Sequence, residues 1–328
     1  MMVGLGSGKA TRQGLSWPDL FARFPDDATA ERWFEETRWG TAGQPSFCPK
    51  CGATTRLRPT PNRHPLPYWC PHCRRHFSVR TNTVLHKSRL PLQKWIVAIY
   101  IWSTSRKGAS SLQLARDLGI SPQAAWYLGQ RLRTIWRDDW YHGATAPREP
   151  LFCGPVEVDE TYVGGLERSK HLKHRLRAGR GAVGKTPVVG ILDRPTNTIA
   201  ADVVPRTDRP TLHNFIQQHV QPGAQVYTDN NRAYRELPNP HAWVNHSAGE
   251  YVRGNVHTNG IESFWAQLKR TYRGTHHYIS PDHLPRYVAE MSARHNLRSQ
   301  DTLDIMRAVA IRLLARRLTY ADVRRAKR

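Results

Sequence analysis

The sequence predicts an α/β domain with a five-stranded sheet, preceded by a cysteine-rich module and a helical module. Short apolar segments have the length and β-branched content of strands, and amphipathic helical patterns lie between and after them. Two closely spaced cysteine pairs lie nearer the N-terminus, and residues 108–136 contain two helical patterns separated by a turn. The expected strands are 155–162, 187–193, 199–204 and 224–228, with a weaker one at 242–245.

The overall charge indicates a polyanionic partner. The 328 residues include 49 Lys and Arg against 26 Asp and Glu, which gives a formal net charge of +23. A small domain needs a net charge of only about 2–8 for solubility, so nucleic acid is the first candidate and a merely solvated surface the alternative. No apolar run approaches the ~18 residues of a membrane-spanning helix, and residues 1–14 lack a secretory signal. We therefore expect a cytoplasmic protein with no membrane partner, associated with the nucleoid when bound to DNA.

The cysteine spacing predicts a structural zinc site. Cys48 and Cys51 form one pair, Cys70 and Cys73 form another, and 18 residues separate the pairs. Each pair can place two thiolates on one tetrahedral Zn²⁺, as in a zinc ribbon, whereas redox or disulfide use is the less favoured reading in a cytosolic chain. Four thiolates fill the coordination sphere, so this ion is expected to be structural. Cys153 stands alone among apolar residues and is expected to be packed.

Residues 111–133, SLQLARDLGISPQAAWYLGQRLR, predict a helix-turn-helix. Gly119 permits the turn, Ser121 is a favoured N-cap and Pro122 a favoured first helical residue. The expected core of the first helix is Leu112, Leu114, Ala115 and Leu118. The polar residues expected to face a DNA groove or backbone are Gln123, Gln130, Arg131 and Arg133. An ordinary helical hairpin is the alternative.

Acidic side chains interrupt the strand at 155–162. Alternation puts Val156 and Val158 on one face and Glu157 and Asp159 on the other. A carboxylate on a central strand is costly to bury unless a cation meets it. The strand therefore indicates a cation site on its acidic face.

Two further acids occur at matching places in the predicted fold. Asp229 ends the strand at 224–228, and Glu262 lies in the first turn of a later helix. Each acid alone is equally compatible with a surface or capping role. Together with Asp159 they match the RNase H-like arrangement, in which carboxylates hold two Mg²⁺ or Mn²⁺ ions at a phosphodiester. We expect Asp159, Asp229 and Glu262 to be both catalytic residues and metal ligands.

The segments VEVDETYVGG, VYTDNNRAY and VHTNGIESFWAQLKRTYRGTHHYIS resemble the motif blocks of bacterial insertion-sequence DDE transposases of the ISXO kind. The resemblance covers about residues 18–300 and includes an N-terminal zinc ribbon. It implies an RNase H-like catalytic domain, the triad Asp159, Asp229 and Glu262, and cleavage and strand transfer on double-stranded DNA. It also implies element ends and target DNA as partners and a dimer or higher homo-oligomer.

Two other functions remain open: a DNA-binding regulator derived from a transposase, and a metal-dependent nuclease that cuts without joining. The three acids argue against the first. His257 and Asn259 are expected to touch the scissile phosphate or to cap a helix, and the basic loop at 166–186 to contact phosphates. Glu157 and Glu160 have no assigned role.

The predicted domain boundaries follow these patterns. They are an N-terminal tail and helical lead at 1–45, a zinc ribbon at 46–85, a helix-turn-helix region at 86–140, an RNase H-like DDE catalytic domain at 150–300 and a basic helical tail at 301–328.

Overall fold

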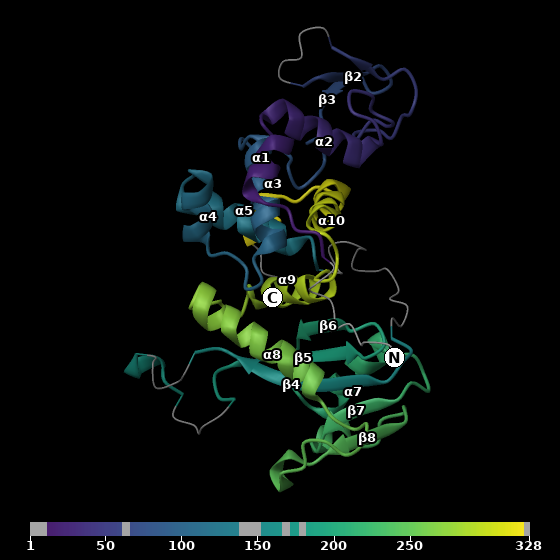
Figure 1. The fold of residues 1–328 in the computed structure, drawn as a ribbon, viewed down its shortest axis with the longest axis vertical. Coiled ribbons are helices and arrows are strands. Elements are labelled where there is room, and N and C mark those ends of the chain that lie inside the picture. The colour runs from purple at the N-terminus through teal and green to yellow at the C-terminus, as the bar shows by residue number, and fades with distance from the viewer. Residues whose placement is uncertain (1–11, 61–65, 138–151, 166–170, 177–181, 325–328) are drawn as a thin grey trace, which may run out of the picture. The chain divides into compact units, whose positions relative to one another are not determined.

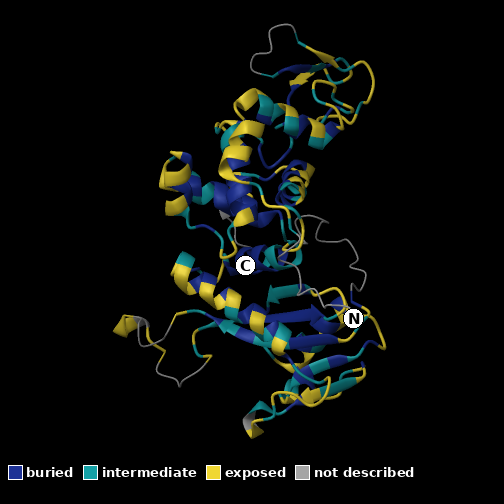
Figure 2. Cartoon of the chain, viewed as in Figure 1, coloured by how far each residue is buried: buried dark blue, intermediate teal, exposed yellow. Residues whose placement is uncertain are grey.

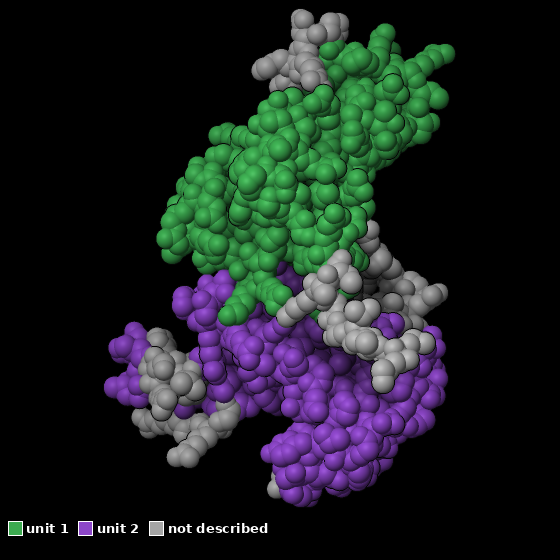
Figure 3. All heavy atoms as spheres, viewed as in Figure 1, with its two compact units in different colours: residues 1–141, 297–328 green, residues 142–296 purple. Residues whose placement is uncertain are grey.

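The computed structural model describes residues 12–60, 66–137, 152–165, 171–176 and 182–324 (Figure 1). The chain forms two compact units, coloured separately in Figure 3. One unit contains residues 1–141 and 297–328, and the other contains residues 142–296. None of the described helices has the length and apolar character needed to cross a membrane.

The first unit is built mainly of helices. Asp26 caps α2 by accepting a hydrogen bond from the Thr29 amide, and α3 is buried along nearly its whole length because most of its residues are apolar (Figure 2). Helix α10 packs against α2 and α3, and the Val84 amide donates to the Leu313 carbonyl. The described α-helices of this unit are α1 (Trp17–Arg23), α2 (Asp27–Trp39), α3 (Leu92–Thr104), α4 (Ser111–Leu118), α5 (Pro122–Thr134), α10 (Thr302–Ala315) and α11 (Tyr320–Arg324).

A small antiparallel sheet follows the first cysteine pair and holds the second. Its strands are β1 (Arg58–Pro59), β2 (Tyr68–Cys70) and β3 (Arg75–Phe77), in the order β1-β2-β3. Cys70 lies at the end of β2 and Cys73 between β2 and β3. The Tyr68 hydroxyl donates to the buried Glu35 carboxylate of α2 at 2.7 Å. This hydrogen bond and the edge-on stacking of Trp39 against Tyr68 join the ribbon to the helix.

Helices α4 and α5 form the predicted pair. Gly119 ends α4 with a φ of +56°, and the Ser121 hydroxyl accepts the Ala124 amide to begin α5. The prediction was wrong for Leu112, which is 63% exposed. It was also wrong for three polar residues of α5: Gln130, Arg131 and Arg133 are buried. The C-terminal half of α5 is covered within the unit, so only its start, including Gln123, remains exposed.

The second unit contains the predicted mixed five-stranded sheet. Its strands are β4 (Val156–Val163), β5 (Thr186–Asp193), β6 (Thr198–Val203), β7 (Val226–Asp229) and β8 (His241–Val244), all close to their predicted positions. The order is β6-β5-β4-β7-β8; β4 is antiparallel to β5 and parallel to β7. Cys153, just before β4, is exposed, contrary to expectation.

Helices cover both faces of this sheet (Figure 1). Helices α8 (Asn259–Thr271) and α9 (Leu284–Asn296) pack on one face, and α7 (Arg209–His219) packs on the other. Val156 and Val158 belong to the core under α7, as the alternation predicted. Glu157 and Asp159 therefore lie on the face covered by α8.

Close packing of α8 depends on a glycine. A Cβ atom at Gly190 would lie 2.7 Å from the Trp265 ring. Gly190 pairs with Asp159 across β4 and β5. The absence of a side chain at Gly190 therefore makes room for the indole of Trp265 beside Asp159.

Candidate functional site

Asp159 lies near the middle of the sheet on its central strand, β4. Its Oδ2 accepts a hydrogen bond from Trp265 Nε1 at 3.0 Å. Burial raises the pKa of Asp159 well above its usual range, and the neighbouring acids Glu160, Asp229 and Glu262 raise it further. The carboxyl group is thus surrounded by groups of its own charge, in an environment that favours a cation.

Asp229 ends β7, the neighbouring strand parallel to β4. Its Oδ1 accepts a hydrogen bond from the Asn231 backbone amide at 3.0 Å, and this bond shapes the turn after the strand. Because β7 is parallel to β4, the carboxyl end of β7 reaches the part of the sheet that carries Asp159. The register pairs Glu157 with Tyr227, so Asp229 lies level with Asp159 two residues further along both strands.

Glu262 lies in the first turn of α8, as predicted. Its Oε1 accepts the Thr258 hydroxyl at 2.8 Å, and His246 Nε2 lies 3.7 Å from the same oxygen. Its amide donates to the Thr258 carbonyl. The buried Thr258 therefore holds both the backbone and the side chain of Glu262.

The three carboxylates supply the oxygen donors that Mg²⁺ and Mn²⁺ prefer. Among the residues that the structure describes, their oxygens are not gathered within the 4.8 Å limit that the four cysteine sulfurs meet. Asp159, Asp229 and Glu262 are thus a donor set whose chemistry fits hard divalent ions.

Glu157, left without a role by the sequence, joins β4 to the start of α8. Its side chain is 1% exposed. Oε1 accepts a hydrogen bond from Arg194 Nε at 2.8 Å. Oε2 accepts hydrogen bonds from the backbone amides of Gly260 at 2.8 Å and Ile261 at 3.1 Å. His257 Nδ1 lies 3.2 Å from Oε1. Thus Glu157 contacts the helix that carries Glu262.

Glu160, the other unassigned acid, points to the opposite face of β4. It accepts Asn231 Nδ2 at 2.7 Å and the Tyr234 hydroxyl at 2.5 Å. Burial raises its pKa, and the charge of Asp229 adds to the effect. Glu160 therefore ties β4 to the turn that follows Asp229.

The four paired cysteines form the one group of potential metal ligands that meets the 4.8 Å limit within the described parts of the chain. Cys48 and Cys73 have their Sγ atoms 3.8 Å apart, and Cys51 and Cys70 have theirs 3.6 Å apart. Zinc–sulfur bonds of about 2.3 Å in a tetrahedron require sulfur separations of about 3.8 Å. The cluster fits one structural Zn²⁺.

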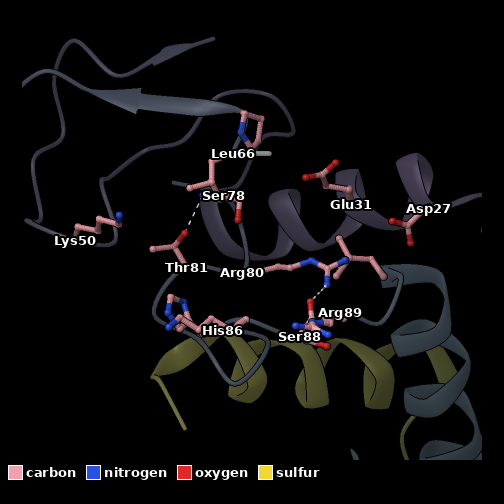
Figure 4. Close-up of a pocket in the computed structure, with 13 residues that line it drawn as sticks. Asp27, Glu31, Lys50, Leu66, Ser78, Arg80, Thr81, His86, Ser88 and Arg89 are labelled. Carbon is pink, nitrogen blue, oxygen red and sulfur yellow. Dashed lines mark hydrogen bonds between the residues drawn. The ribbon is translucent and has the colours of Figure 1, made fainter. Parts of the chain in front are cut away.

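A pocket of about 590 Å³ lies in the first unit, beside the ribbon (Figure 4). Asp27 and Glu31 line it together with several basic residues: Lys50, Arg80, His86, Lys87 and Arg89. Arg80 Nη1 donates to the carbonyls of Ser88 and Leu90, and this contact fixes one wall. Its mixed charge contrasts with the acidic surroundings of Asp159.

Several contacts of the site were not predicted. No functional role was assigned to Trp265 from the sequence, but its indole contacts Asp159. Thr258 and His246 were not considered, although both approach Glu262. The helical spacing of Trp265, three residues after Glu262, was a signal that could have placed it on the same side of α8. Parts of the basic loop, residues 166–170 and 177–181, lie outside the described residues.

The sheet order and the helices on both faces define an RNase H-like α/β fold. Residues 152–296 match the model of the ISXO2-like transposase domain. A Halobacterium salinarum protein described as an "Uncharacterized protein in transposable element ISH50" is 31% identical over 284 residues, which cover 83% of this chain and 91% of that protein. The chain belongs to the ISXO2-like transposase family.

A second relative supports the same family. A Haemophilus influenzae "Uncharacterized transposase-like protein" is 33% identical over 97 residues, which cover 29% of this chain and 77% of the relative. The predicted resemblance to insertion-sequence transposases is thus confirmed.

Proposed function

We propose that the protein cuts the ends of its own DNA element and joins the released 3′-hydroxyl to target DNA. The observation that carries the proposal is the place of Asp159: a partly buried carboxyl group on the central strand, level with Asp229 at the end of β7 and bonded to Trp265 of the helix that carries Glu262. Such a group is unfavourable for folding by itself and favourable for holding a divalent cation.

Asp159, Asp229 and Glu262 are assigned as the metal ligands. When bound, two Mg²⁺ or Mn²⁺ ions would activate the attacking oxygen and stabilise the leaving oxygen at the phosphodiester. Trp265 orients the Asp159 carboxylate, and Thr258 orients that of Glu262. Both orienting groups are themselves buried, which restricts their movement.

The first unit is assigned to DNA recognition. The net charge of +23 favours binding to the phosphate backbone. The zinc ribbon and the exposed start of α5 are assigned to the element ends. Because two ends must be brought together for joining, the active species is expected to contain at least two protomers.

The test separates transposition from its alternatives. The protein is incubated with Mg²⁺, labelled terminal-repeat DNA and a target plasmid. Strand-transfer product supports the proposal, cleavage without joining indicates a nuclease, and binding alone indicates a regulator. Asp229→Asn serves as the matched variant, and strand transfer by it at the wild-type rate would remove Asp229 from the proposed site.

A further inference from the structure

Among the described residues of the second unit, Glu157 is the least exposed carboxylate and is more buried than any of the three assigned metal ligands. Its four contacts come from two directions. Arg194 and His257 approach Oε1, while the amides of Gly260 and Ile261 donate to Oε2. A buried charge with matched donors on both oxygens is stable, whereas the same charge without them would be very costly.

Arg194 extends this contact to the segment that leads into α8. Its Nη1 donates to the Asn255 carbonyl at 2.6 Å and its Nη2 to the His257 carbonyl at 2.8 Å. The guanidinium also lies over the Tyr227 ring, 4.4 Å from its centroid. Arg194 thus joins Glu157 to the backbone just before α8 and to a side chain of β7, the strand that ends in Asp229.

The contact between β4 and α8 is close enough to exclude a side chain at Gly260. A Cβ atom there would lie 2.2 Å from Leu192 Cδ2 and 2.9 Å from Glu157 Oε2. The start of α8 is therefore held directly against the sheet. Glu262 follows two residues later, so its place relative to Asp159 depends on this contact.

We infer that Glu157 is a positioning residue that, through Arg194 and the first amides of α8, sets Glu262 opposite Asp159 for cation binding. The inference rests on the proposed function of the three acids. Glu157 itself needs no metal contact, because both of its oxygens already accept hydrogen bonds from the chain.

Glu157→Gln tests the inference at nearly constant volume. Glutamine has one acceptor oxygen and one donor NH₂ group. Either orientation therefore sets the NH₂ group against donors, because Arg194 donates on one side and the helix amides donate on the other. Asp193→Asn is the matched control, since Asp193 is also a buried acid of the sheet but bonds only the turn at Thr196.

Amide hydrogen exchange on the metal-free full-length protein reads the helix position without requiring activity. We expect exchange at Gly260 and Ile261 to be about 10-fold faster in Glu157→Gln and unchanged in Asp193→Asn. We also expect Mn²⁺ affinity, measured by electron paramagnetic resonance, and the DNA cleavage rate each to fall about 10–100-fold while end-DNA affinity is retained. Wild-type exchange together with wild-type Mn²⁺ affinity in Glu157→Gln would overturn the inference.

A second variant keeps the test decisive if Glu157→Gln does not fold. Gly260→Ala leaves the acid in place but sets a methyl group 2.2 Å from Leu192 Cδ2 and 2.9 Å from Glu157 Oε2. We expect this crowding to loosen the contact between Glu157 and α8 and to give the same faster exchange and weaker Mn²⁺ binding. Unchanged exchange and Mn²⁺ affinity in Gly260→Ala would equally overturn the inference. Failure of the wild-type protein to cut end DNA would instead refute the proposed function, while the exchange data still decide the role of Glu157.

Discussion

Trp265 Nε1 and Asp159 Oδ2 are joined by a 3.0 Å hydrogen bond between the core of α8 and the central strand of the sheet. The indole ring is almost fully buried, with Gly190 leaving room for it. One side chain therefore both fills the core and fixes the orientation of a carboxylate assigned to metal binding.

Replacing Trp265 with Phe should separate these two roles. The ring still packs, but Asp159 loses its donor, so we expect a stability loss of about 1 kcal/mol and a fall in cleavage rate of about 10–100-fold. Tb³⁺ luminescence excited through tryptophan should also fall, because the Trp265 indole contacts Asp159 directly. Trp243→Phe, which alters an exposed tryptophan of the same unit, should keep both signals; loss of luminescence in that variant instead would contradict the assignment.

Asp159→Asn should abolish cleavage but stabilise the metal-free protein. The folded pKa of Asp159 is raised, so above about pH 4 the unfolded state has released a proton that the folded state retains. Stability therefore falls as pH rises from there through the folded pKa. The melting temperature of Asp159→Asn should therefore exceed that of the wild type by a margin that grows as pH rises over this range. Adding Mg²⁺ should reduce the margin. Thermal melts from pH 4 to 8 measure this, and an advantage that decreased with rising pH would contradict it.

Removal of zinc should unfold the ribbon. The sulfur separations fit one tetrahedral ion, and structural zinc contributes about 10–16 kcal/mol of binding free energy in zinc-finger peptides. We expect one zinc per chain by metal analysis, with loss of zinc and a lower melting temperature in Cys48→Ser. Cys153→Ser is the control, because Cys153 is exposed and lies outside the cluster; zinc retained in full by Cys48→Ser would exclude the site.

Across α4 and α5 we expect exposed arginines to bind DNA and buried ones to stabilise the fold. Arg116 is exposed on α4, so Arg116→Ala should weaken DNA binding and reduce the salt slope by about 1 without changing the melting temperature. Arg133 is buried on α5, so Arg133→Met should cost about 1–3 kcal/mol of stability. Salt titrations of DNA binding and thermal melts distinguish them, and the reverse pattern would restore the original prediction for α5.

The sequence was informative where one local pattern decides the structure. Alternation in β4 placed Val156 and Val158 on the opposite face from Glu157 and Asp159 because strand geometry alone determines the face. Spacing also brought the four cysteines together, since each pair forms a local turn. Gly119 and Ser121 marked the break between α4 and α5 for the same reason.

Prediction failed where partners come from distant parts of the chain. Glu157 had no interpretation because its hydrogen-bond donors are far away in the sequence. Arg194 lies 37 residues away, and the amides of Gly260 and Ile261 lie 103 and 104 residues away. Arg131 seemed suited to DNA, but it lies over Tyr127, whose ring contacts Tyr320 near the C-terminus. Polarity alone could not show that a C-terminal helix would cover this part of α5.

The return of the chain to its first unit has a consequence for biosynthesis. Helix α10 supplies apolar side chains to a core whose other helices, α2 and α3, lie more than 190 residues earlier in the chain. A ribosome completes the second unit, which ends at residue 296, before it makes α10, so the nascent N-terminal region emerges with a hydrophobic surface still uncovered. The first unit can therefore close only after the second unit has been synthesised, so its maturation is timed by synthesis of the second unit.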